Sequence, residues 1–118
     1  MPGSKRMINI RAFIRKDGCL GGLTAEGHAL KASPGYSPVC AGVTTLLRTG
    51  GELLEAEEDI KAEISAPSEG TLRVLIGRVP GQKLERVRAI TDFLLYGLQQ
   101  LCQDAPEEIE VSIEEREE

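Results

Sequence analysis

The sequence has few of the residue types on which metal and redox sites depend. Its 118 residues include no tryptophan and one histidine, and aromatic side chains make up only 3% of the chain. The three cysteines, Cys19, Cys40 and Cys102, lie far apart and form no CxxC pair, which excludes the common zinc-site and dithiol spacings. We therefore expect free thiols, no metal, no cofactor, and a core built mainly from aliphatic side chains.

Long hydrophobic runs are also missing from the chain. No apolar stretch approaches the ~20 residues that a membrane helix needs, and the first residues, MPGSKRMINI, lack the apolar segment of a signal peptide. The net charge of −5 disfavours binding to a phosphate backbone, which requires clustered lysine and arginine. These features predict a cytoplasmic protein that contacts neither membrane nor nucleic acid directly and that tolerates a basic partner.

Hydrophobic residues repeat with a period of two in several short segments, and this pattern predicts strands. The clearest alternation follows Met7, and Lys16-Asp17-Gly18 then predicts a hairpin turn. We predict strands at residues 8–14, from the turn to about Ala25, at 60–65, at 72–79 and around 109–113. Gly21 and Gly22 weaken the second of these.

Two segments carry helix signals. Ser37 suits an N-cap and Pro38 a first helical position, so a helix is predicted from there to Gly50-Gly51 or on to about Glu55. Apolar residues spaced by three and four between 84 and 101 predict a second, amphipathic helix. The order β-β-α-β-β-α-β predicts an α+β two-layer sandwich, with a mixed or antiparallel sheet and both helices on one face. We expect one domain over 7–114, a disordered leader over 1–6 and an acidic tail over 115–118.

The segment EGHALKASPGYSPVCAG, residues 26–42, contains the single histidine, His28, and ends with Cys40, twelve residues further on. If Ser37 caps the helix, Cys40 falls in the first turn, where the first N–H groups and the positive end of the helix dipole favour a thiolate. An imidazole nearby would serve as its base. The residues alone also allow a bland interpretation, with Cys40 as a small buried hydrophobe and His28 as a loop residue.

The stretch EGHA, followed by a glycine-containing loop and by VCAG at a helix start, resembles the ribosomal-processing cysteine proteases of the Prp family, formerly YsxB-like. The resemblance covers residues 7 to about 113 and includes the strand start MINI at Met7. It implies a small cytoplasmic protease, commonly homodimeric, that removes the N-terminal extension of the bacterial large-subunit ribosomal protein numbered twenty-seven and cuts after an aromatic residue.

The same resemblance implies roles for individual residues. The nucleophile falls on Cys40 and the general base on His28, while Gly27 matches the glycine before the histidine. Residues 30–36, with Gly35, match the loop over the substrate cleft. Backbone N–H groups around Cys40 and Ala41, at the helix start, are the candidates for stabilising an oxyanion.

The sequence departs from the family at two positions next to this site. Many members have an acidic residue three positions before the cysteine, where this chain has Ser37, and Thr44 stands where a small hydroxyl residue is common. Two other hypotheses therefore remain open beside the protease. One is a non-catalytic ribosome-assembly or binding module of the same fold, and the weaker one is a redox-sensing thiol at Cys40.

Overall fold

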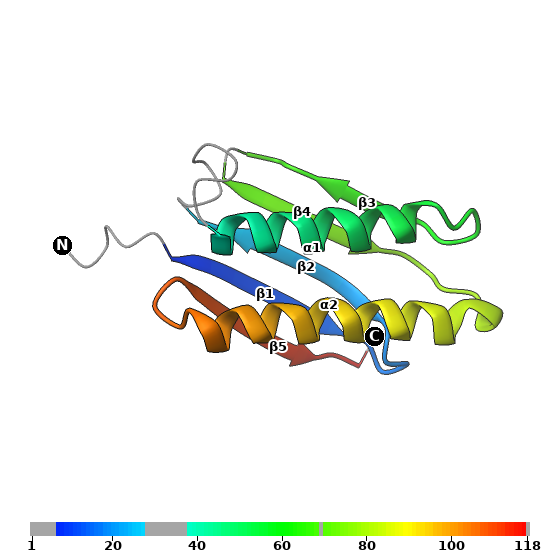
Figure 1. Ribbon diagram of the computed structural model, residues 1–118. Coiled ribbons are helices and arrows are strands. Elements are labelled where there is room, and N and C mark those ends of the chain that lie inside the picture. The colour runs from blue at the N-terminus through cyan, green and yellow to red at the C-terminus, as the bar shows by residue number, and fades with distance from the viewer. Residues whose placement is uncertain (1–6, 28–37, 69, 118) are drawn as a thin grey trace.

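A computed structural model describes residues 7–27, 38–68 and 70–117. In chain order its elements are β1 (Ile8–Ile14), β2 (Leu20–Glu26), α1 (Pro38–Glu55), β3 (Ala62–Ser65), β4 (Thr71–Ile76), the short 3-10 helix η3 (Gly81–Lys83), α2 (Leu84–Asp104) and β5 (Ile109–Glu115). The predicted order of strands and long helices is confirmed. Both α-helices cover the same face of a five-stranded sheet, which confirms the predicted two-layer α+β architecture (Figure 1).

The strands follow the order β3-β4-β2-β1-β5 across the sheet, which is mixed. Three neighbouring pairs are antiparallel, and β5 alone runs parallel to its neighbour β1. The β1–β2 turn forms as predicted, because Gly18 adopts a φ of 88° and the Asp17 carboxylate accepts a hydrogen bond from the Cys19 N–H at 2.9 Å.

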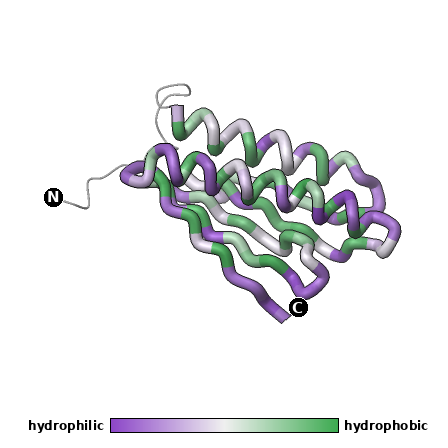
Figure 2. Tube along the Cα trace, turned by 60° about the horizontal axis from the view of Figure 1, so that its bottom comes forward, coloured by the Kyte–Doolittle hydropathy of each residue, from purple (hydrophilic) through white to green (hydrophobic). Residues whose placement is uncertain are grey.

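The core lies between the sheet and the helices. On β1, Ile8 and Ile10 are buried while Asn9 and Arg11 between them are exposed, so the alternation in the sequence divides an inner from an outer face. The alternation of hydrophobic and hydrophilic residues along strands and helices is visible in Figure 2. The side chains that fill the core from the helices are mainly aliphatic, as predicted: Val43, Leu47, Leu54, Val87, Leu94 and Leu98.

Helix α1 continues through Gly50 and Gly51 to Glu55, so the longer of the two predicted endings is confirmed. A Cβ atom on Gly50 would lie 2.6 Å from Leu94 Cδ2, and one on Gly51 would lie 2.2 Å from Ile64 Cδ1. The two glycines therefore allow α2 and β3 to approach the helix closely. The packing of α2 and β3 against these glycines offsets the free-energy cost of placing glycine inside a helix.

Strands β3 and β4 are shorter than predicted. Ile60 is buried but donates its N–H to the Glu57 carbonyl in a turn, so β3 starts later, at Ala62. At the other end, β4 stops at Ile76, and the Gly77 N–H bonds to the Lys61 carbonyl just beyond it. Among the helices that the structure describes, none is long and apolar enough to cross a membrane.

Candidate active site

Cys40 is the third residue of α1, which begins at Pro38. Proline suits this start because its fixed φ is helical and its missing N–H is one that a first turn leaves without an intrahelical acceptor. The first turn contains no acidic residue. The positive end of the helix dipole therefore lies at the Cys40 side chain without an opposing carboxylate from that turn.

The Cys40 side chain is only 4% exposed and belongs to the hydrophobic core cluster, next to Val39 and Val43. Burial keeps the Cys40 sulfur away from solvent. A nucleophile must also touch its substrate. Reaction at Cys40 therefore requires this side chain to become more exposed than it is here.

Gly27 follows the last residue of β2 and directly precedes His28. A Cβ atom at Gly27 would lie 2.5 Å from the Met7 carbonyl oxygen and 2.9 Å from the Ile8 Cα, both of which are backbone atoms. The Gly27 N–H also donates to the Gly70 carbonyl at 3.0 Å. Backbone on both sides thus fixes the position from which the chain leaves the sheet toward His28.

The other candidate site residues divide into two groups. Ala41 and Thr44 lie on α1, are half-buried, and follow Cys40 by one residue and by about one turn. His28, Gly35, Ser37 and the loop over 30–36 lie outside the described residues. The structure thus positions the cysteine and the glycine before the histidine, and the His28–Cys40 pair stays a prediction.

The remaining cysteines occupy different environments. Cys19 immediately precedes the start of β2, is fully buried, and has its pKa raised to about 11 by burial and by the neighbouring Asp17 carboxylate. Cys102 lies near the end of α2 and donates its thiol hydrogen to the Ile109 carbonyl at 3.4 Å. All three cysteines lie in the described part of the chain, and none is in a disulfide. In that same part, no group of His, Cys, Asp and Glu residues could hold a metal ion.

A hollow on the outer face of the sheet was not predicted from the sequence. The sheet face opposite the helices carries a hollow of about 380 Å³, lined by residues that include Arg11, Gly22 and Arg73. The signal was present as two consecutive glycines within a strand pattern, because a glycine there often marks a close approach of another group.

Comparison with known proteins identifies the family of this chain. The family model described as cysteine protease Prp matches residues 7–110. A structure of SMU.848 from Streptococcus mutans has 25% identity and a TM-score of 0.76, and the match covers 97% of this chain and 99% of that one. No match is found among the curated proteins.

Two structures of an essential ribosomal processing protease Prp from S. aureus share the fold. One holds a covalently linked product peptide (18% identity, TM-score 0.75) and the other a substrate peptide (17% identity, TM-score 0.73). Each match covers 92% of this chain and 100% of that one. Because the family model spans most of its length, this chain belongs to the family of cysteine protease Prp.

Proposed function

We propose that this protease removes the N-terminal extension of a bacterial large-subunit ribosomal protein, with Cys40 as nucleophile and His28 as general base. The observation that carries the assignment of the nucleophile is the position of Cys40 in the first turn of α1, twelve residues after the histidine. The S. aureus proteases of the same fold are ribosomal processing enzymes that hold peptides, which supports a peptide substrate.

The reaction begins when His28 accepts the proton of the Cys40 thiol. The thiolate then attacks the carbonyl carbon of the scissile peptide bond, and the N–H groups of Cys40 and Ala41 stabilise the oxyanion that forms. His28 returns the proton to the leaving amine, and the C–N bond breaks to give a thioester. Water, deprotonated by His28, attacks the thioester carbonyl and releases the acid product and the thiol.

Gly27 contributes to this site by positioning. Its close contact with the backbone of Met7 and Ile8 fixes the last residue before His28 relative to the central strands of the sheet. A base must lie within hydrogen-bond reach of the proton that it accepts. A fixed starting point for the segment that carries His28 reduces the number of conformations from which this contact must be found.

Cleavage of a peptide copied from the N-terminus of the host's ribosomal protein tests the proposal. Cys40→Ala should abolish cleavage, and the matched control Cys102→Ala should retain it, because the Cys102 thiol lies near the C-terminal end of α2 and donates to the Ile109 carbonyl. Cleavage by Cys40→Ala at the rate of the unmodified protein would eliminate Cys40 as the nucleophile. A host ribosomal protein without an N-terminal extension would eliminate the processing role while leaving the peptidase chemistry intact.

We also propose that the active form is a homodimer in the cytoplasm. A small chain with 3% aromatic residues has a limited core of its own, and burial of further apolar surface between two copies would add stability. Phe93 and Tyr96 on α2 are 67% and 68% exposed and supply apolar surface for such a contact. Sedimentation equilibrium at micromolar concentration should give about twice 12.8 kDa, and a mass of one chain would exclude the dimer.

A further inference from the structure

The outer face of the sheet, opposite the helices, brings together two rows of side chains from β1, β2 and β4. In one row Thr24 pairs with Arg11 on one side and with Arg73 on the other. In the next row Gly22 pairs with Phe13 and with Leu75. Because side chains alternate between the faces of a sheet, both rows point away from α1 and α2. Together they line the hollow of about 380 Å³.

The row formed by Phe13, Gly22 and Leu75 is apolar, and Gly22 lies between the other two residues. A Cβ atom on Gly22 would lie 2.8 Å from Phe13 Cε2 and 3.2 Å from Leu75 Cδ2, so these two side chains occupy the place of the side chain that glycine lacks. The guanidinium of Arg116 lies 4.0 Å from the centroid of the Phe13 ring, which holds the ring over the glycines. Leu75 is 43% exposed and leaves apolar surface open to solvent.

The polar row places two positive charges on either side of a hydroxyl group. Neither Arg11 nor Arg73 forms a salt bridge or a side-chain hydrogen bond with another residue that the structure describes. By contrast, Arg116 at the edge of the hollow pairs with Glu114 at 2.9 Å. Two guanidinium groups without carboxylate partners, in a chain of net charge −5, mark a place where an anionic group would bind.

We propose that this hollow is a second peptide-docking site, which binds an extended segment presenting a carboxylate two residues away from a large apolar side chain. The carboxylate would lie between Arg11 and Arg73, within reach of the Thr24 hydroxyl, and the apolar side chain would lie against Phe13 and Leu75. The two rows are two residues apart along each strand, ~7 Å, which equals the distance between side chains i and i+2 of an extended peptide.

The surrounding charges favour a peptide over a nucleic acid. Four glutamates lie on the same outer face around the two arginines: Glu26, Glu63, Glu110 and Glu114. A polyphosphate backbone laid across this face would meet several of these carboxylates, whereas a single carboxylate bound between the arginines has Glu26, two residues from Thr24 along β2, as its neighbouring acidic residue. The site is separate from the candidate active site, because Cys40 lies on α1 and therefore in the layer that covers the other face of the sheet.

Binding of two synthetic peptides to the full chain tests the proposal. The first is acetyl-Ser-Phe-Ser-Glu-Ser-amide, and the second replaces its glutamate with glutamine. Two-dimensional amide NMR with the Cys40→Ala protein, which avoids cleavage, should show shifts at positions 22, 24 and 73 on addition of the first peptide. The glutamine peptide should bind at least about threefold more weakly, since it lacks the charge that the arginines recognise.

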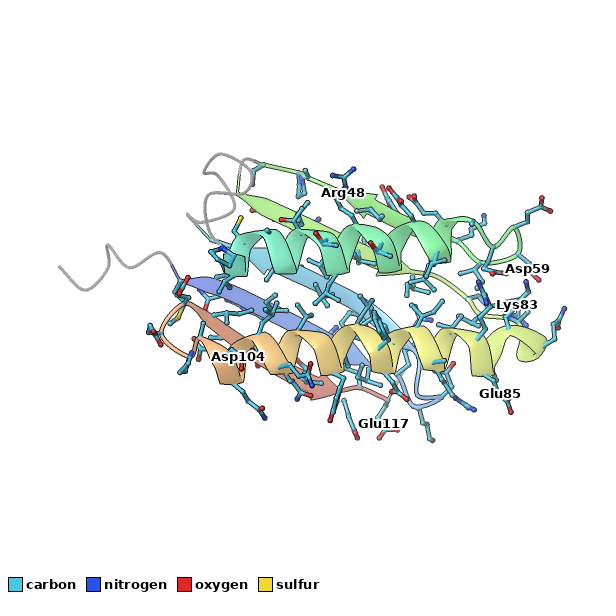
Figure 3. The ribbon with its side chains drawn as sticks, in the orientation of Figure 1. Arg48, Asp59, Lys83, Glu85, Asp104 and Glu117 are labelled. Carbon is cyan, nitrogen blue, oxygen red and sulfur yellow. The ribbon has the colours of Figure 1, made fainter. Side chains whose placement is uncertain are left out.

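Three variants that each remove one positive charge provide the comparison. Arg11→Gln and Arg73→Gln should each weaken binding of the glutamate peptide at least about threefold. Arg48→Gln removes the same charge from α1, in the helix layer, where Figure 3 labels it, and should leave binding unchanged. Amide spectra without peptide show whether each variant keeps its fold.

Each possible outcome of these experiments either supports the docking site or overturns it. Shifts confined to the outer face, with the expected preference for glutamate and loss in both arginine variants, support the docking site. Equal binding of the two peptides, equal effects of Arg48→Gln and Arg73→Gln, or no shifts on this face would overturn it. Binding of a short oligouridylate at these positions in place of the peptide would overturn it in favour of a nucleic-acid site. None of these results depends on whether the protein cleaves a ribosomal protein.

Discussion

Gly27 and Met7 are in such close contact that a Cβ atom on Gly27 would lie 2.5 Å from the Met7 carbonyl oxygen. The atom that blocks a side chain here belongs to the backbone at the start of β1, and it cannot move without shifting the strand. Gly27 also precedes His28 directly, so this contact connects the central strands of the sheet with the segment that carries the proposed base.

Gly27→Ala should therefore reduce both stability and activity. The added methyl group forces β1 and the end of β2 apart, which should cost about 1–3 kcal/mol of unfolding free energy. Urea unfolding and peptide cleavage measure the two effects. Gly81→Ala is the matched control, because a Cβ atom at Gly81 meets nothing within 4 Å. Equal stability of the two variants would show that the contact at Gly27 relaxes easily.

Competitive iodoacetamide labelling should distinguish the three cysteines. Cys40 should react at least about threefold faster than Cys102, since the N–H groups and the positive dipole end at a helix start stabilise negative charge on an attacking sulfur, whereas a helix end does not. Cys19 should react last, because it is fully buried and its pKa is raised to about 11. Mass spectrometry of the labelled peptides measures the order. Faster labelling of Cys102 than of Cys40 would mean that the burial of Cys40 outweighs its position at the helix start.

The pKa of Cys19 also predicts how stability changes with pH. Burial and Asp17 raise this pKa from 9.0 to about 11, so between these values the unfolded chain loses the thiol proton while the folded chain keeps it. The contribution of the neutral thiol is complete below pH 9 and is lost as the pH rises through 11. The loss should amount to roughly 2–3 kcal/mol.

Urea midpoints between pH 8 and 10.5 measure this effect, with Cys19→Ala as the reference. Other groups that titrate in this range are present in both proteins, so the difference between the two pH profiles isolates Cys19. The unmodified protein should lose stability more steeply above pH 9. Parallel profiles would show that the Cys19 thiol is no harder to ionise in the folded chain than in the unfolded one.

The strands and helices were predictable because their signals are local. The alternation over 8–14 and the three-and-four spacing over 84–101 each describe one element and its buried face, and the His–Cys spacing pointed to the family. The end of α1 was left open because a helix passes through Gly50 and Gly51 only if Leu94 and Ile64 pack there, and no local pattern contains that contact.

The two consecutive glycines indicated a close approach in β2, but the hollow on the outer face could not be predicted from them, for a related reason. Its two rows depend on the register that pairs Thr24 of β2 with Arg73 of β4, and these two strands are separated in the sequence by a helix and a further strand. The sequence showed Gly22 only as a weakness in a strand. The structure shows that Phe13 and Leu75 occupy the place that a side chain at this position would take.

A buried hydrogen bond joins α2 to the start of β2, and its loss should lower the free energy of unfolding. Thr91 is 2% exposed, and its hydroxyl oxygen accepts the Leu20 N–H at 3.0 Å. Thr91→Val keeps the side-chain shape but leaves this buried N–H without its acceptor, which should cost about 1–3 kcal/mol. Thr49→Val, on the exposed surface of α1, is the control and should change little. Equal urea midpoints for the two variants would show that Leu20 finds another acceptor.

Ser37→Asp restores the acidic residue that many members of the family have three positions before the cysteine. Serine and aspartate are nearly equal as N-caps, so stability should stay almost unchanged. A carboxylate here would oppose the Cys40 thiolate by charge repulsion, and it would also orient His28 or favour its imidazolium form, as the third member of a catalytic triad does. Water and salt screen the repulsion, whereas orientation of a base is a geometric effect that screening does not remove. We therefore expect kcat/KM on one peptide to rise or to stay equal. A decrease of about tenfold or more, with an unchanged circular dichroism spectrum, would mean that this site is adapted to an uncharged residue 37.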